Sequence, residues 1–419
     1  MRLNKESLRR PSLILSWSLY DLANQFFALN VVSLYFVRWL TLERGQPEIL
    51  YSAAYGISTF LIAVSSPVLG ALSDINGRRR PFLVYLTLIA VVFTMLLGLG
   101  DSILLGLIFF VIANFGCQTA IVFYNALMTG IAPRARIGLV SGLGKMFGYI
   151  GAVLALYFIK PVVLRSGYKA TFLPTGILFL LFSLPCLIFV KDRFVKANVS
   201  LRSFLSRAKV RQVFADLRAM ALDARRFPGL ADFLRAAFFG LCAVNVIILF
   251  MSIYATRAFG MSESEVINLI AFSTLFAIIG SISSGFISDY VGHKQSLGAV
   301  YILWMVCLLG GALVRDHRLY WVVGALAGFS LGSTWVVTRA LAIKLVPEAE
   351  IAKVFGLFSL VGYLAAIIGA MFWGIALLLL SPLGALGYRL ALGSLALFVA
   401  IGFIFLLRIP KNNKVNKDA

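Results

Sequence analysis

One carboxylate and one amide interrupt the first long apolar stretch of this chain, at Asp21 and Asn24. An isolated aspartate near the centre of a bilayer costs roughly 2.5–3.5 kcal/mol on insertion scales, so a carboxylate at such a depth usually faces a polar cavity or an ion path. Asn24 follows Asp21 by three residues and therefore lies on the same face of a helix. We expect these two side chains, with Tyr20 and Tyr149 as aromatic neighbours, to line a path for a polar solute or an ion.

Two cationic side chains, Lys145 and Arg339, are expected at a depth comparable to that of Asp21. At about 1.5 Å per residue, Asp21 and Lys145 lie roughly 10 Å, and Arg339 roughly 8 Å, from the same membrane face. Asp21 can pair with Lys145 or with Arg339, and protonation or substrate binding can break that pair. Alternatively, both cations extend to the interface and Asp21 hydrogen-bonds locally. The cations can also hold a carboxylate of the substrate.

The composition predicts an all-α membrane protein. The 419 residues are 61% apolar and only 13% charged, and the mean hydropathy is +0.94. Apolar stretches long enough to cross about 30 Å of hydrocarbon recur along the chain. We expect twelve transmembrane helices, at residues 14–40, 50–72, 82–100, 103–131, 138–160, 171–190, 232–256, 266–288, 297–315, 320–344, 354–380 and 387–408. The first stretch is too long for a cleavable signal peptide.

The net charge of +21 follows the positive-inside rule. With a cytoplasmic N-terminus, most of the 38 Lys and Arg residues fall in inner segments, above all between 191 and 229. We therefore expect both termini in the cytoplasm, a location in the cytoplasmic (plasma) membrane, and anionic lipids of the inner leaflet as partners. A nucleic-acid partner is not expected.

The remaining reactive side chains suggest neither an enzyme nor a bound cofactor. The four cysteines are scattered through apolar stretches without metal-ligand spacing, and both histidines fall in loops. Gly144 and Lys145 superficially match a phosphate-binding loop, but Met146 stands where that loop needs Ser or Thr. No metal or nucleotide site is expected, so the energy for any transport must come from a gradient.

The second half of the chain repeats the first at an offset of about 214 residues. Pro133, Gly142 and Tyr149 correspond to positions 347, 356 and 363, which are again Pro, Gly and Tyr. This repeat predicts six helices in residues 1–190, a basic linker with amphipathic helices in 191–229, and six helices with a short basic tail in 230–419. A solvated linker is the alternative for the middle segment.

A glycine-rich acidic and basic motif also occurs twice, at residues 70–80 and 285–294. The first copy resembles the major facilitator motif G-x-L-[AS]-D-x-x-G-R-[RK], and the second is a weaker version. We expect the glycines to allow close helix packing and tight loops, and the charged residues to fasten the cytoplasmic side in one conformation. These gating residues are Gly70, Asp74, Gly77, Arg78, Arg79, Gly285, Asp289, Gly292 and Lys294.

A narrower resemblance covers most of the chain. The sequence at residues 20–24, Tyr-Asp-Leu-Ala-Asn, is similar to the Tyr-Asp-Trp-Ala-Asn opening of the vacuole-effluxer-like branch of that superfamily, as are the glycines of 141–151 and the segment 332–356. Leu22 replaces the usual Trp, and Ala243-Val244-Asn245 stands where the branch tends to have Asp-Gly. Because the seventh helix usually lines the cavity in this superfamily, the resemblance implies a substrate contact at Asn245.

These features together predict a twelve-helix secondary transporter with substrate held between its halves. The resemblance implies a small polar solute, such as an amino acid or a related zwitterion or anion. From its depth in the first helix we expect Asp21 to be the coupling or charge-sensing group, with a proton as one candidate for the coupling ion. The runner-up is a lipid-moving or receptor-like protein of the same fold. We expect a monomer. The direction of transport, the coupling ion and the exact substrate stay open at this point.

Overall fold

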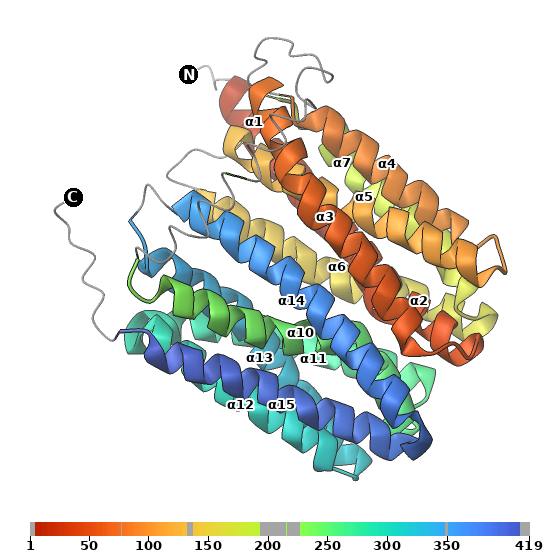
Figure 1. Cartoon of the computed structure of the whole chain (residues 1–419). Coiled ribbons are helices and arrows are strands. Elements are labelled where there is room, and N and C mark those ends of the chain that lie inside the picture. The colour runs from red at the N-terminus through yellow and green to blue at the C-terminus, as the bar shows by residue number, and fades with distance from the viewer. Residues whose placement is uncertain are drawn as a thin grey trace. The chain divides into compact units, whose positions relative to one another are not determined.

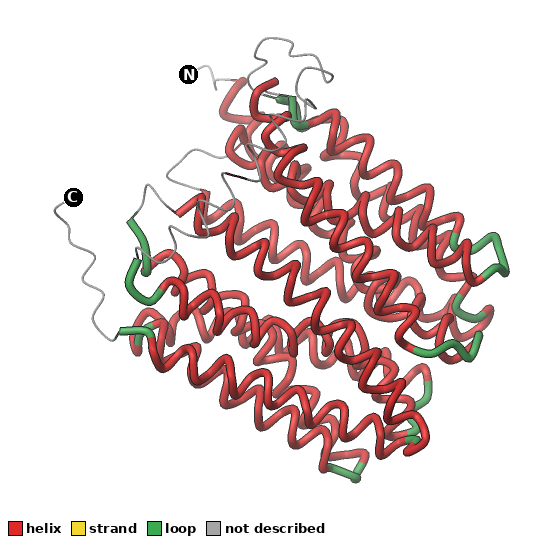
Figure 2. Tube along the Cα trace, viewed as in Figure 1, coloured by secondary structure: helices red, strands yellow, loops and turns green. Residues whose placement is uncertain are grey.

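The structure is a computed structural model, and it describes residues 5–76, 78–131, 137–192, 215, 227–347 and 351–410. Helices joined by short loops make up the described part of the chain (Figure 2). The predicted linker at 191–229 lies almost entirely outside the described residues. The chain divides into two compact units, an N-terminal unit of Met1–Gln46 and Ile57–Val213, and a C-terminal unit of Pro47–Gly56 and Phe214–Ala419.

The described residues of the first half of the chain form six helical segments, and Figure 1 labels their helices. The first starts as α1 and continues without a break through η1, α2 and η2, where parts of the backbone are π-helical. The bounds are α1 Lys5–Phe27, η1 Ala28–Tyr35, α2 Phe36–Arg38, η2 Trp39–Glu43, α3 Glu48–Asn76, α4 Arg80–Leu96, α5 Ile103–Ile131, α6 Ile137–Ser166 and α7 Phe172–Phe189. The helix α3 starts in the C-terminal unit and ends in the N-terminal unit.

Six further helices form the second half of the chain. Their bounds are α10 Leu230–Phe259, α11 Glu263–Val291, α12 His293–Leu313, α13 His317–Lys344, α14 Ile351–Leu380 and α15 Ala385–Arg408. Short loops with left-handed glycines, such as Gly260 at φ +67° and Gly292 at φ +106°, connect them. Glycine adopts these angles without the steric penalty of a side chain.

The predicted twelve spans correspond one to one with these helical segments. Eleven are long and apolar enough to cross a membrane, and the remaining one, α4, has an apolar helix of only 17 residues. The predicted all-α membrane fold is confirmed.

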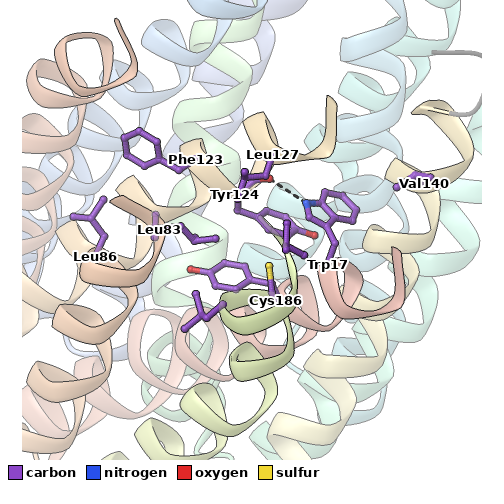
Figure 3. Packing of buried hydrophobic residues seen from close by; sticks show 12 residues of the cluster. Trp17, Leu83, Leu86, Phe123, Tyr124, Leu127, Val140 and Cys186 are labelled. Carbon is purple, nitrogen blue, oxygen red and sulfur yellow. Dashed lines mark hydrogen bonds between the residues drawn. The ribbon is translucent and has the colours of Figure 1, made fainter. Parts of the chain in front are cut away.

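An aromatic core holds the helices of the N-terminal unit together (Figure 3). The Trp17 ring on α1 stacks on Tyr124 of α5 with centroids 4.5 Å apart, and its Nε1 donates to the Tyr124 carbonyl at 3.0 Å. Tyr20 stacks on the same Tyr124 ring at 4.8 Å. These contacts fix α1, which carries Asp21, against α5. Cys186 of α7 belongs to the same cluster and is buried.

The C-terminal unit instead brings two helix backbones into direct contact. A Cβ at Gly328 or Gly332 of α13 would lie 2.0 or 1.9 Å from a backbone oxygen of α11, and one at Gly280 would lie 2.2 Å from the carbonyl oxygen of Phe329. Only glycine fits these positions, since any side chain would overlap the neighbouring helix.

Candidate functional site

An ion pair joins Asp21 of α1 to Lys145 of α6. The Lys145 Nζ lies 3.4 Å from Asp21 Oδ2. The Asp21 side chain is 9% exposed, whereas the Lys145 side chain is 54% exposed, so the carboxylate is the enclosed partner and the ammonium the accessible one. Of the two pairings predicted for Asp21, the structure contains the one with Lys145.

Glycines on α6 make room for the carboxylate and for α1 itself. A Cβ at Gly144 would lie 2.7 Å from the Trp17 ring and 3.3 Å from Asp21 Oδ2, and one at Gly151 would lie 2.4 Å from the Leu22 carbonyl oxygen. Gly148 faces the Asp21 carboxyl carbon, with its Cβ position 3.8 Å away. Gly144 and Gly151 of α6 therefore allow close packing against α1.

This geometry allows the pair to act as a charge switch. In a protein interior an unpaired charge is far more costly than a paired one, so Asp21 and Lys145 stabilise each other only while both are charged and close together. A proton on Asp21, or a ligand with its own ammonium and carboxylate, would compete with the pair. The exposed Lys145 side chain gives such a ligand access.

The structure places Tyr20 and Asn24 beside Asp21 in sequence but gives each another partner. Tyr20 is fully buried in the aromatic core, with its hydroxyl 2.7 Å from Thr87 Oγ1 on α4. Asn24 is also buried, and its Oδ1 accepts from the Cys117 thiol at 2.9 Å. These contacts anchor α1 to α4 and α5 around the carboxylate.

The other predicted substrate contacts are Tyr149, Asn245 and Arg339. Tyr149 is half-buried on α6. Asn245 is half-buried on α10, where its Nδ2 donates to the Leu241 carbonyl one turn earlier at 2.8 Å. Arg339 is exposed on α13 of the C-terminal unit. Their roles as substrate contacts remain predictions.

The basic end of the first gating motif binds helix ends and a carboxylate. The Arg79 side chain donates to the Ala126 carbonyl at 2.8 Å, and the Arg79 backbone N–H donates to Asp192 Oδ1 at 2.9 Å. Arg80 Nε donates to the Leu187 carbonyl at the end of α7 at 2.8 Å. Arg78 is exposed. Gly77 and the side chain of Asp74 lie outside the described residues.

In the second copy, Lys294 has the corresponding capping role. Its Nζ donates to the Leu407 carbonyl at 3.0 Å and to the Ile409 carbonyl, at the end of α15. Gly292 forms the tight loop that the motif predicts, with φ +106°. Asp289 is exposed at the end of α11.

One expectation for this motif is wrong. A Cβ at Gly70 would meet no described atom within 4 Å, and one at Gly285 would meet only Val336, at an ordinary contact distance of 3.8 Å. Among the described residues, no neighbouring helix comes within close-packing distance of either glycine. The close approaches lie elsewhere, at Gly151 on α6 and at the α11–α13 contact.

Sequence reasoning missed a buried acid at the start of α3. Glu48 is 9% exposed and accepts a hydrogen bond from the Tyr388 hydroxyl of α15. It was missed because the predicted span began at residue 50, which left Glu48 in a loop. Among the described residues, no group of His, Cys, Asp and Glu side chains could hold a metal ion.

Comparison with known proteins gives consistent results. The family model described as "Vacuole effluxer Atg22 like" matches residues 48–419. An uncharacterized protein of Aquifex aeolicus (strain VF5) is 26% identical over 94% of this chain and 96% of its own length. The uncharacterized MFS-type transporter YxiO of Bacillus subtilis (strain 168) is 24% identical over 96% of this chain and 95% of its own length. The crystal structure of the nucleoside transporter NupG is similar in fold, with TM-score 0.71, 14% identity, and coverage of 96% of this chain and 100% of that one.

Proposed function

Since the chain belongs to the vacuole effluxer Atg22-like family of major facilitator transporters, we propose that it carries an amino acid or a related zwitterion or anion across the membrane by alternating access. It is a multi-pass membrane transporter, and its substrate is a small molecule. The observation that carries the proposed substrate class is the ion pair between Asp21 and Lys145.

A zwitterion matches that pair in charge. Its ammonium group competes with Lys145 for the Asp21 carboxylate, and its carboxylate competes with Asp21 for the Lys145 ammonium. Each charge of the protein then exchanges one partner for another, so the enclosed Asp21 carboxylate is not left unpaired. A neutral sugar offers no such exchange.

Proton coupling through Asp21 is the second part of the proposal. Protonation removes the attraction that holds Lys145 at 3.4 Å and releases the ammonium for a substrate carboxylate. In this mechanism the Asp21 carboxylate acts as the coupling group and Lys145 as the substrate anchor. Arg339, Asn245 and Tyr149 are proposed as further substrate contacts.

The predicted architecture completes the proposal. Residues 1–190 and 230–419 form the two halves, and the basic segment 191–229 contacts anionic lipid on the cytoplasmic side of the plasma membrane, where both termini lie. The protein acts as a monomer. Asp74 and Asp289 fasten the cytoplasmic ends of the helices in one conformation and release them in the other.

Transport into proteoliposomes tests this function. The purified protein is reconstituted with an inside-negative or pH gradient, and uptake of radiolabelled leucine, lysine, glutamate, uridine and glucose is compared. We expect saturable uptake of at least one amino acid and no uptake of glucose. Asp21→Asn is expected to remove the response to the pH gradient while leaving the protein folded.

Asp232→Asn is the matched control. Asp232 also forms an ion pair inside a membrane helix, at 2.9 Å from Arg235, but both partners lie on the same helix of the C-terminal unit. Transport in this variant should equal that of the parent. Full gradient-driven uptake by Asp21→Asn would exclude the coupling role, and movement of lipid without any solute uptake would favour the lipid-moving alternative.

A further inference from the structure

A cavity of about 310 Å³ lies within the C-terminal unit, where α10 and α14 end and α15 begins. Its polar lining consists of Glu48, Arg257, Tyr388 and Ser381, and its apolar lining includes Leu377 and Leu380. Glu48 belongs to the segment Pro47–Gly56, which is part of this unit. The volume is at the lower end of the range for small-molecule pockets, roughly 300–1,000 Å³.

The charges of this cavity are arranged around one hydroxyl group. Tyr388 donates to Glu48 Oε1, and the Arg257 side chain hydrogen-bonds to Tyr388. Tyr388 therefore links an acid and a base that come from different helices, α3 and α10. Glu48 and Arg257 each form a hydrogen bond with the Tyr388 hydroxyl.

The Glu48 carboxylate can accept more hydrogen bonds than the described residues donate to it. It is 9% exposed, and within the described part of the chain only Oε1 accepts a hydrogen bond. An ionised carboxylate has about four acceptor positions on two oxygens, and Glu48 lines the cavity, so its remaining positions are available to a donor there. An ammonium group in the cavity would supply the missing donors.

We propose that this cavity is a second binding site for a small zwitterion with an apolar side chain. The ammonium group of the ligand binds Glu48, its carboxylate binds Arg257, and its side chain packs on Leu377 and Leu380. The choice of ligand class rests on the proposed function, because it assumes that the cavity takes the same kind of solute as the site at Asp21. A contact that merely joined α3 to α15 would need the Glu48–Tyr388 bond but neither Arg257 nor the open volume.

Calorimetric titration of three related probes tests each contact separately. Leucine has both charged groups, leucinamide lacks the carboxylate, and 4-methylpentanoate lacks the ammonium. The full-length Asp21→Asn protein is used, so that the first site does not contribute. Leucine is expected to bind more tightly than either analogue.

Three substitutions should then separate the contributions of the individual contacts. Glu48→Gln keeps the shape of the side chain and is expected to weaken leucine and leucinamide at least tenfold while leaving 4-methylpentanoate unchanged. Arg257→Gln should weaken leucine and 4-methylpentanoate and spare leucinamide. Tyr388→Phe should weaken leucine several-fold, because Tyr388 positions both charges.

Asp232→Asn and Arg235→Gln, added to the same background, are the matched controls and should bind all three probes like the parent. No leucine binding to the Asp21→Asn protein, or binding that Glu48→Gln does not change, would overturn the inference. So would a lower melting temperature in Glu48→Gln with unaltered affinities, since that marks a purely structural contact. The proposed function fails by a different result, the absence of amino-acid uptake in proteoliposomes.

Discussion

The two halves of the chain share one framework and differ in where they place charge. Within the repeated motif the offset is 215 residues, so Lys294 corresponds to Arg79. Lys294 and Arg80, the residue after Arg79, each donate to carbonyls at the end of the last helix of their own half. By contrast, at the offset of 214 residues Asp21 corresponds to Arg235 and Lys145 to Ser359. The interhelical ion pair of the first half therefore has no equivalent in the second. The repeat preserves the contacts that hold helices together and not those proposed to bind substrate.

The halves also differ at one equivalent point between two helices. In the N-terminal unit, Asn114 of α5 donates to Ser58 of α3 at 2.7 Å. In the C-terminal unit, glycines at 328 and 332 let α13 touch the α11 backbone directly. Equivalent helices can thus be held by a side-chain hydrogen bond or by close backbone packing, as is usual where the surrounding lipid is as apolar as the helices.

The largest expected effect is a loss of transport that a substitution at Asp21 should cause and a similar substitution in the second half should not. Asp21→Asn should reduce amino-acid transport by about tenfold or more, because it removes the carboxylate proposed to bind the substrate ammonium, and a hydrogen bond to a charged group contributes about 1.5–3 kcal/mol. Asp232→Asn in the second half should change it less than twofold. Initial rates in proteoliposomes provide the measurement, and equal losses in both variants would remove the proposed asymmetry.

Alanine substitutions at Gly332 and at Gly70 should change the stability of the protein in opposite directions. Gly332→Ala places a Cβ 1.9 Å from the Ala277 oxygen, so it should destabilise the protein by about 1–3 kcal/mol or more. Gly70→Ala adds a methyl group in open space and should stabilise the helix by up to about 1 kcal/mol. Thermal unfolding in detergent distinguishes them, and a destabilised Gly70→Ala protein would show that this glycine has a contact after all.

Arg80 and Lys294, which cap the last helix of each half, should contribute similarly to stability. Arg80→Met and Lys294→Met each remove hydrogen bonds to the carbonyls that end α7 or α15, so each should lower stability by about 1 kcal/mol. The double variant should show the sum of both effects, since the caps lie in separate units. A loss in only one half would mean that the repeat conserves the sequence of the motif but not its energetic role.

The smallest effect concerns an exposed cluster of the first half. Lys169, at 2.7 Å, and Arg44 lower the pKa of Asp101 below its ordinary value of 3.8. Because the folded state prefers the charged form, this contribution is complete above pH 4 and is lost as the pH falls through the lowered pKa. The stability difference between the parent and Asp101→Asn should therefore shrink between pH 5 and pH 2. A difference that stays constant over this range would exclude the electrostatic origin.

Much of the site was predictable because its signals are local. A charged residue in an apolar stretch marks a costly position regardless of the fold, and this identified Asp21 and Lys145. Gly144 and Gly151 of α6 pack closely against Trp17 and Leu22. Gly70 was misjudged because a packing role depends on what lies opposite, and a motif does not contain that information.

Tyr20 also shows that the sequence does not tell what lies opposite a side chain. Its place next to Asp21 suggested a substrate contact, whereas the helix turns it by about 100° into the aromatic core, where it meets Thr87. Glu48 was missed altogether, since its burial depends on α15, which is some 340 residues away in the chain.

The sequence by itself determined the membrane class, the twelve spans, the internal repeat and the charged residues that had to be paired. Hydropathy and the cost of charge in hydrocarbon act on each segment separately, so these properties can be calculated from composition and spacing. Only the tertiary structure decided that Lys145 is the partner of Asp21, that Gly332 rather than Gly70 meets a neighbouring backbone, and that Glu48, Arg257 and Tyr388 share a cavity. These choices depend on which helices touch and at what rotation, and a difference of a few ångströms between side chains from distant segments settles them.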